Sequence, residues 1–485
     1  MSPLRNLLIL LLALVALPAF AEDDDDRFEV KFGKDLAFRG GRVNIDHGFG
    51  SLSVRTHAGD TVQVRATIRS SDEEIGKQIR ILTGEGAGGV TIRTDFPEIR
   101  RFSGRLSYSV DMTVVIPANA PLTAKNQFGN TDVRGLRAAV QLENKQGSIR
   151  LHDTQAAAAV TGSFGSIEVV DNRGPLAVTN QNGSVNVRKV SGALTVTNRF
   201  GSIDVADVTS TATLTNANGS IEATDVTGAL RATSAFGNVT ASTVGPADIT
   251  TSNARVELSN VSGSAIVRNS FGNVTATTIR GTLTVDGDNS RVEASGIGGD
   301  ANLDTGFGGV TLRDVSGKAV IKNNNGNIKV SDIGGALDAT TSFGSIGAER
   351  IRGAAAVRSS NGSVTLHDIG GPVNVKASFG SVFVDNAAGA VTVANSNGAI
   401  AVAGLRGTAC HPLALTTNFS SIKVSLPPGA GYNVNARTSF GRIATALPIT
   451  TTTISESNLV GTIGRGGCKL DLVNSNGNIT IEKAN

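Results

Sequence analysis

A glycine recurs every 18 residues through the middle of the chain, and this repeat restricts the fold more than any other feature of the sequence. The glycines of the series are Gly129, Gly147, Gly165, Gly183, Gly201, Gly219, Gly237, Gly272, Gly308, Gly326, Gly344, Gly362, Gly380 and Gly398, with Ala254 and Ser290 at two of the places. A fixed period of this kind is typical of repeat architectures, in which each unit packs against its neighbours.

Each unit has the pattern of two short strands. In the unit that begins at Gly183, Val185 and Val187 alternate with polar residues, and so do Leu194 and Val196. Period-two alternation places the apolar pair inward, and the glycines between the strands suit turns. The repeat region shows no helical periodicity. We therefore predict an all-β fold, a parallel β-helix or β-solenoid built from 18-residue units, with irregular β caps at both ends.

A second period lies over the first, because the residue before the turn glycine alternates between Phe and a polar residue that is usually Asn. The phenylalanines are Phe128, Phe164, Phe200, Phe236, Phe271, Phe307, Phe343 and Phe379. A coil of 36 residues would stack Phe on Phe, whereas a coil of 18 residues is easier to fill with Val, Ile and Leu. Like-on-like stacking slightly favours 36 residues. We also expect these Phe side chains, in a chain without Trp, to be buried.

The sequence divides into four regions. Residues 1–21 resemble a signal peptide, residues 22–125 an N-terminal β region and cap, residues 126–405 the regular solenoid, and residues 406–485 a C-terminal β cap. The spacing of the turns loosens after residue 406, and Leu426-Pro427-Pro428-Gly429 interrupts the pattern. Irregular ends of this kind are typical of caps over exposed solenoid edges.

The first 21 residues predict export. Arg5 precedes an apolar run from Leu7 to Leu17, and Ala19-Phe20-Ala21 offers small residues at a cleavage site. The run is shorter than the roughly 20 residues that span a bilayer, although a short membrane anchor is the alternative. We expect an exported protein of the periplasm or cell surface, with no transmembrane anchor after cleavage.

Export would place the two cysteines, Cys410 and Cys468, in an oxidising compartment, which favours a disulfide between them. Each stands just before an alternating, strand-like segment, at 411–415 and 469–472. Similar places in neighbouring strands could bring the two sulfur atoms within bonding distance. We predict a Cys410–Cys468 disulfide. Two separate buried thiols are the alternative.

The turns also carry a family resemblance. Phe-Gly-Ser-Ile at 164–167 and Asn-Gly-Ser-Val at 182–185 alternate through the repeat, and the sequences around 115–129, 422–427 and 438–441 fit its two ends. In these features the chain resembles the bacterial "putative adhesin" family of β-strand-repeat proteins. The resemblance implies an exported β-helix of either hand, and it brings no catalytic residues to transfer.

Sites for chemistry are sparse in this sequence. Residues 84–89 match the G-x-G-x-x-G pattern of dinucleotide sites, but a strand-like segment follows where a helix is needed, so a hairpin loop is favoured. The five histidines are scattered and predict no zinc site. A column of Asp residues falls six positions after the turn position, at Asp153, Asp171, Asp207, Asp225, Asp314, Asp332 and Asp368. It could bind Ca²⁺ between coils, but a role in the turns is favoured.

We therefore expect a non-enzymatic surface or periplasmic scaffold, without catalytic residues, cofactor or metal, that binds through its polar faces. The partner classes that fit are a cell-surface polysaccharide or protein. Balanced charge and export argue against nucleic acid, since the net charge is only +3. The alternative is a polysaccharide-processing enzyme on a β-helix, which rests on fold analogy alone. A surface cleft with two or more clustered carboxylates would favour that enzyme.

Overall fold

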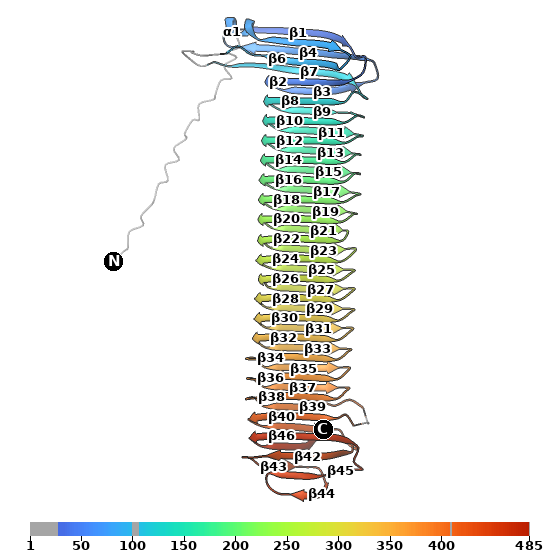
Figure 1. The fold of residues 1–485 in the computed structure, drawn as a ribbon, viewed down its shortest axis with the longest axis vertical. Coiled ribbons are helices and arrows are strands. Elements are labelled where there is room, and N and C mark those ends of the chain that lie inside the picture. Colours follow the sequence, from blue (N-terminus) through green and yellow to red (C-terminus); the bar gives the residue numbers. More distant parts are fainter. Residues whose placement is uncertain (1–27, 99–105, 408–409, 485) are drawn as a thin grey trace, which may run out of the picture.

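The structure, a computed structural model, describes residues 28–98, 106–407 and 410–484. The predicted signal peptide lies outside these residues. The described chain forms a tall column of stacked β-strands with a small cap at each end (Figure 1). About 17 parallel coils form a β-solenoid. At about 4.8 Å per coil, these coils make a column of roughly 80 Å.

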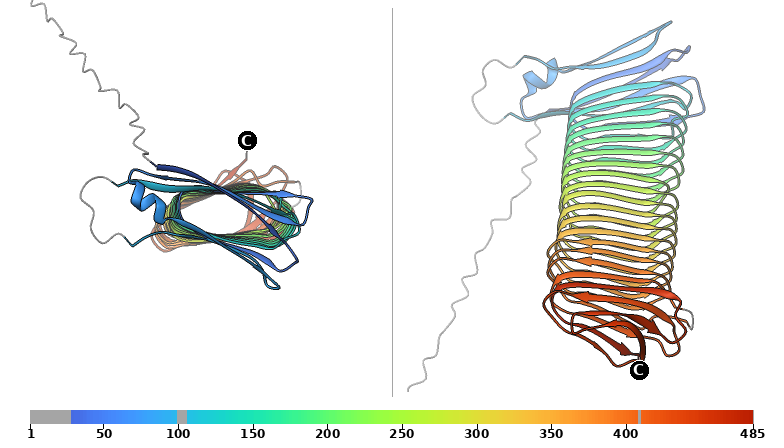
Figure 2. Two further views of the ribbon diagram at one scale, coloured as in Figure 1. Left: turned by 90° about the horizontal axis from the view of Figure 1, so that it is seen from above. Right: turned by 60° about the horizontal axis from the view of Figure 1, so that its bottom comes forward.

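Each coil consists of two strands that belong to two facing sheets. β14 (Leu176–Asn182) turns at Gly183 into β15 (Val185–Val190), and the next turn leads to β16 (Leu194–Phe200). β16 pairs in parallel with β14, so one coil is 18 residues long. Seen along its axis, the column has a flattened, oval outline (Figure 2).

The alternation of apolar and polar residues along each strand explains which side chains fill the interior of the column. In β14 the side chains of Leu176, Val178 and Asn180 are buried, and the residues between them are exposed. In β15, Val185, Val187 and Val190 are buried. Because the strands pair in parallel without a shift, apolar residues of successive coils lie on one another, and a continuous core runs through the column.

The 36-residue coil favoured from the Phe and Asn alternation is wrong. Phe200 pairs with Asn182 on one side and with Asn218 on the other, so Phe and Asn alternate along one corner. The physical reason is the width of the interior. Two facing sheets bring their Val, Ile, Leu and Ala side chains into direct contact, whereas four sides would leave a space that these residues cannot fill.

The first coil lies far from the others in sequence. β2 (Arg42–Phe49) pairs in parallel with β8 (Leu122–Phe128), and β3 (Leu52–His57) pairs with β9 (Thr131–Arg134). Phe49-Gly50 thus forms the same corner turn as Phe128-Gly129. The chain between these coils builds the N-terminal cap together with residues 28–37.

The N-terminal cap extends both sheets beyond the first coil. β6 (Gly89–Asp95) adds to β2, and β5 (Arg80–Gly86) closes that sheet as an antiparallel partner of β6. The β5–β6 connection confirms the hairpin predicted at the G-x-G-x-x-G match. On the other sheet, β7 (Tyr108–Pro117), β4 (Thr61–Ser70) and β1 (Phe28–Ala37) follow β3 in that order. The short helix α1 (Glu73–Gln78) connects β4 to β5.

At the C-terminal end, the order of the coils in space differs from their order in the sequence. β40 (Leu413–Phe419) and β41 (Ile422–Leu426) pair with β46 (Cys468–Asn476) and β47 (Ile479–Lys483). The coil that follows β41 in sequence, β42 (Tyr432–Thr438) and β43 (Ile443–Thr445), lies beyond that pair. A hairpin of β44 (Ile449–Ile454) and β45 (Asn458–Ile463) then covers β42. The last coil in sequence is therefore inserted between two earlier ones.

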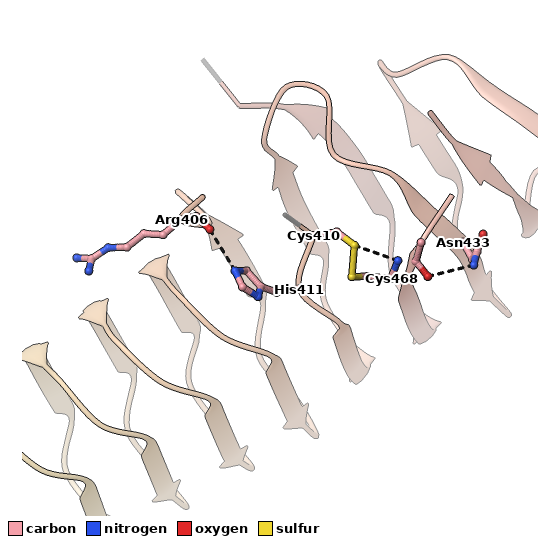
Figure 3. Close-up of a disulfide and its surroundings, with 6 residues drawn as sticks. Arg406, Cys410, His411, Asn433 and Cys468 are labelled. Atoms are coloured by element: carbon pink, nitrogen blue, oxygen red, sulfur yellow. Dashed lines mark hydrogen bonds between the residues drawn. A yellow bond between two sulfur atoms is a disulfide. The ribbon is translucent and has the colours of Figure 1, made fainter. Parts of the chain in front are cut away.

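A disulfide ties the inserted coil to its neighbour. The sulfur atoms of Cys410 and Cys468 lie 2.05 Å apart and the Cα atoms 5.7 Å apart, as the sequence predicts for equivalent places in adjacent strands. The amide of Cys468 also donates to the Sγ of Cys410 at 3.1 Å. Figure 3 shows the bond, which joins the segment just before β40 to the first residue of β46, near His411 and Asn433.

Candidate functional site

The phenylalanines of the turns form a ladder on the outside of one corner of the column. The eight predicted Phe side chains are 37% to 57% exposed, and Phe419 of the C-terminal cap is 53% exposed. The expectation that these rings are buried is therefore wrong. We call this set, from Phe128 to Phe419, the aromatic ladder.

The reason for the exposure lies in the geometry of the turn. In β16 the buried positions are Leu194, Val196 and Asn198, and alternation would place Phe200 inward next. The alternation ends before that point, since Arg199 and Phe200 are both exposed, and Gly201 then takes a left-handed conformation with φ of 108°. Phe200 therefore lies at the corner, and size and hydrophobicity alone do not bury it.

The inside of the same corner is lined in many coils by buried polar side chains, several of them Asn. Nδ2 of Asn198 donates to the carbonyl of Gly183 at 3.0 Å and to that of Gly201 at 3.1 Å. Asn126, Asn180 and Asn269 each bridge two successive turns in the same way. These bonds satisfy carbonyls that would otherwise be buried without a partner. They also hold successive turns in line, and with them the Phe side chains.

The turn glycines have no room for a side chain. A Cβ atom at Gly201 would lie 2.5 Å from the carbonyl oxygen of Gly183, and the same clash recurs along the corner. Glycine also adopts the positive φ of this turn without strain. The turn glycines therefore add no side chains at this corner, and the side chains that project from it are those of the Phe and Asn residues before them.

The outward Asn residues bind the coil before them. Nδ2 of Asn182 donates to the carbonyl of Ser163 at 3.4 Å, and Nδ2 of Asn361 donates to that of Ser342 at 3.1 Å. In both cases the acceptor is the residue before a ladder Phe, 19 positions earlier in the sequence. The same bond forms at Asn218, Asn397 and Asn476. The alternation therefore has a local cause, since these five Asn side chains bond to the backbone beside a ring of the neighbouring coil.

The spacing of the rings is set by the coils. Successive ladder Phe residues lie two coils apart, about 9.6 Å, so they do not stack on one another. At the first coil, by contrast, Phe49 and Phe128 occupy adjacent coils, and their rings stack with centroids 4.7 Å apart and planes 3° apart. The gap between two successive ladder rings is thus wide enough for one more ring, and an Asn or Gln of the intervening coil lies at its base.

Charged residues are rare along the ladder. The four-residue turns from 127–130 to 396–399 contain only five, which are Lys145, Arg199, Arg255, Asp288 and Arg291. The guanidinium of Arg199 lies 5.4 Å from the ring centroid of Phe200. A charge-poor surface with regularly exposed aromatic rings is typical of an interaction site.

The Asp column lies at another corner, at the next-to-last residue of strands of the second sheet, for example Asp153 in β11 (Ile149–Thr154). Every one of its seven Asp residues has a positive φ, between 52° and 61°. Lys189, Thr243, Thr278 and Arg350, which interrupt the column, share this conformation. The left-handed residue breaks the alternation, so that the next side chain returns to the interior. Asp and Asn tolerate this conformation better than most residues, which accounts for the column without a metal.

A shallow groove at this corner contains the clustered carboxylates that would favour an enzyme. Asp314, Asp332 and Asp368 line it together with Arg350 and Arg406. Arg350 donates to Asp332 at 2.6 Å and 2.9 Å, and Arg406 donates to Asp368 at 2.5 Å. These hydrogen bonds lower the pKa of Asp332 and of Asp368. A carboxyl group with a lowered pKa is a poor proton donor at neutral pH.

No group of three or more His, Cys, Asp or Glu side chains is arranged to hold a metal ion within residues 28–98, 106–407 and 410–484. In the same part of the chain, no helix is long and apolar enough to cross a membrane.

Solved structures of three bacterial proteins are similar to the chain at low sequence identity. No protein-family model and no curated protein sequence matches the chain. A solved structure of a "putative cell adhesion protein" from Clostridium sporogenes is similar at 11% identity over 46% of this chain and 100% of that chain, with a TM-score of 0.24. A "putative adhesin" from Bacteroides fragilis is similar at 14% identity over 55% of this chain and 97% of that chain, with a TM-score of 0.25. A "putative adhesin" from Parabacteroides distasonis is similar at 11% identity over 71% of this chain and 97% of that chain, with a TM-score of 0.18.

Proposed function

We propose that the chain is an exported, non-enzymatic, adhesin-like scaffold of the periplasm or cell surface, and that the aromatic ladder is its adhesive surface. The observation that carries the proposal is the line of half-exposed Phe rings on a charge-poor corner. Exposed aromatic rings lose contact with water when they bind, and they are enriched at interaction sites.

The repetition of the ladder explains how weak contacts could suffice. A single ring contact is weak, but rings fixed on one rigid column bind a repetitive surface together, and the combined affinity can exceed that of one contact by orders of magnitude. Cell-surface polysaccharides and protein assemblies are repetitive in this sense. The signal peptide predicted in residues 1–21 and the disulfide both fit a location outside the cytoplasm.

The binding experiment compares the purified chain with a variant in which Phe200, Phe236, Phe271 and Phe307 are replaced by Asn, the residue of the intervening coils. The control is Phe383→Asn, because Phe383 is 40% exposed but lies on a sheet face in β37 (Val382–Ala387). We expect the fourfold variant to lose binding to cell envelopes and the control to keep it. Equal binding by all three proteins would contradict the proposal.

Location is tested separately, by fractionation and by protease treatment of whole cells. Cleavage of the chain in intact cells indicates the cell surface, and protection that ends when the outer layer is opened indicates the periplasm. A chain found in the cytoplasm with its first 21 residues intact would contradict export.

A further inference from the structure

We propose that the partner of the aromatic ladder is a second copy of this chain. The two columns would lie side by side and antiparallel, with the rings of each copy inserted between the rings of the other. This inference rests on the adhesive role proposed for the ladder and names its partner.

The first argument concerns the period. Ladder rings recur every two coils over nearly the whole column, and this interval is set by backbone pairing at about 9.6 Å. A ligand with any other repeat falls out of register after a few rings. A second copy has the same repeat by construction, so it stays in register along the entire ladder.

The second argument concerns the space between the rings. A ring placed midway between two ladder rings would lie about 4.8 Å from each. Phe49 and Phe128 already stack at 4.7 Å with parallel planes, so the chain itself uses this geometry. Rings from a second copy would extend the same stacking to the intervals over the Asn coils.

The third argument is one of symmetry. If the two copies were parallel and related by a twofold axis along the column, residues at the same height in each copy would meet. Phe would then face Phe. In an antiparallel pair, the twofold axis runs across the column and can pass midway between a Phe coil and an Asn coil. Every Phe then faces an Asn of the partner, and the interface is the same patch on both copies.

The fourth argument compares area and charge with what a stable pair needs. Eight rings that are each about half exposed offer on the order of 800 Å² per copy, the amount that a standard interface buries on each side. Four successive turns, at 342–345, 360–363, 378–381 and 396–399, contain no charged residue at all. No like charges therefore meet when this part of the ladder faces another copy.

The experiment measures association of the full purified chain by sedimentation velocity over a range of concentrations. We expect a reversible dimer that weakens about tenfold or more when Phe200, Phe236, Phe271 and Phe307 are replaced by Asn. Phe383→Asn is the matched control and should leave the dimer unchanged. Circular dichroism checks that all variants are folded. A wild-type chain that remains monomeric overturns the inference.

A second variant separates ring insertion from general stickiness. Replacing Asn218, Asn253 and Asn289 by Phe makes the corner more apolar but fills the intervals that the partner's rings would occupy. Insertion predicts a weaker dimer for this variant, whereas non-specific hydrophobic association predicts a stronger one. A stronger dimer therefore overturns the inference.

Spin labels at single introduced cysteines test the orientation. We choose the exposed positions Ser166, Asn273 and Ser381, which lie beside the ladder near one end, the middle and the other end. An antiparallel pair gives label-to-label distances that differ strongly among the three sites, and equal distances overturn it. If the chain is monomeric but still binds cell envelopes through its ladder, this inference fails and the proposed function stands. If ladder variants change neither binding nor association, both fail.

Discussion

Asn476 pairs with Phe419 on adjacent coils, although 57 positions separate the two residues in the sequence. On the far side of Asn476 lies Phe440, whose amide donates to the carbonyl of Ser475 at 2.8 Å. The order in space is therefore Phe, Asn, Phe, while the order in sequence is Phe, Phe, Asn. The alternation follows neighbouring coils and not the chain, which indicates that contact between coils maintains it.

The exposure of the ladder predicts a small effect of truncating one ring. Phe271→Ala should lower the free energy of unfolding by only about 1 kcal/mol, since roughly half of the ring already contacts water. Leu283→Ala, in the next coil, should cost about 2–5 kcal/mol because Leu283 is fully buried. Urea unfolding of both variants checks the contrast. A cost for Phe271→Ala as large as that for Leu283→Ala would show that the ring has a structural role.

Acid should destabilise the N-terminal end through His47. Burial lowers the pKa of His47 from 6.5 to about 4 in the folded chain. Above pH 6.5 the residue is neutral in both states, and stability falls as the pH drops from 6.5 toward 4, because the unfolded chain then binds a proton that the folded chain resists. The loss by pH 4 should be about 3 kcal/mol.

The matched variant for this effect is His47→Asn, since Asn126 occupies the same place in the paired strand. Urea unfolding at pH 7 and at pH 4.5 should show a smaller loss of stability for His47→Asn than for the wild type. His367→Asn, at an exposed histidine, is the control. An unchanged loss in His47→Asn would mean that other groups cause the acid sensitivity.

Removing the disulfide should loosen the inserted coil first. The bond closes a loop of 58 positions, so replacing both cysteines by Ala should cost about 4 kcal/mol on the chain-entropy model. Hydrogen exchange should accelerate in β46 and β47 and remain slow in distant strands such as β15. Equally slow exchange in β46 and β47 with and without the bond would show that strand pairing alone holds this coil.

The left-handed corner predicts a stabilising substitution. Lys189 has a φ of 58°, and Asn is more tolerant of this conformation. Lys189→Asn should therefore raise the free energy of unfolding by up to about 1 kcal/mol. Gly183→Ala should instead destabilise the chain, because its Cβ would lie 2.2 Å from the carbonyl oxygen of Gly165. Thermal unfolding of the two variants should shift in opposite directions, and a shift in the same direction would contradict the expectation.

The regular part of the fold follows from the sequence because its cause is local. Val185, Val187, Leu194 and Val196 alternate with polar residues, and their positions are those of the observed strands. The places of Cys410 and Cys468 before two such strands likewise predicted their pairing. In each case the signal lies within one coil or in equivalent positions of two coils.

The length of the coil and the exposure of Phe could not be obtained in this way. Coil length and Phe exposure both depend on how the backbone turns at each corner. A turn glycine marks the position of a corner, but it does not show whether the side chain before it points inward or outward. At Phe200 the one available sign was Asn198, a polar residue whose buried amide already occupies the interior corner. The insertion of β46 and β47 between earlier coils has no local signal, because any coil can pair with any other.

The direction of the backbone hydrogen bonds gives the column a distinct mechanical character. Since the strands run across the column, the bonds between coils point along its length, for example from Gly183 to Phe200 and from Gly201 to Asn218. Tension applied between the two ends therefore loads a few bonds at a time at the outermost coil, and each coil that peels away releases up to about 60 Å of chain. A tether built in this way lengthens in equal steps under load and so limits the force that reaches whatever its surface holds.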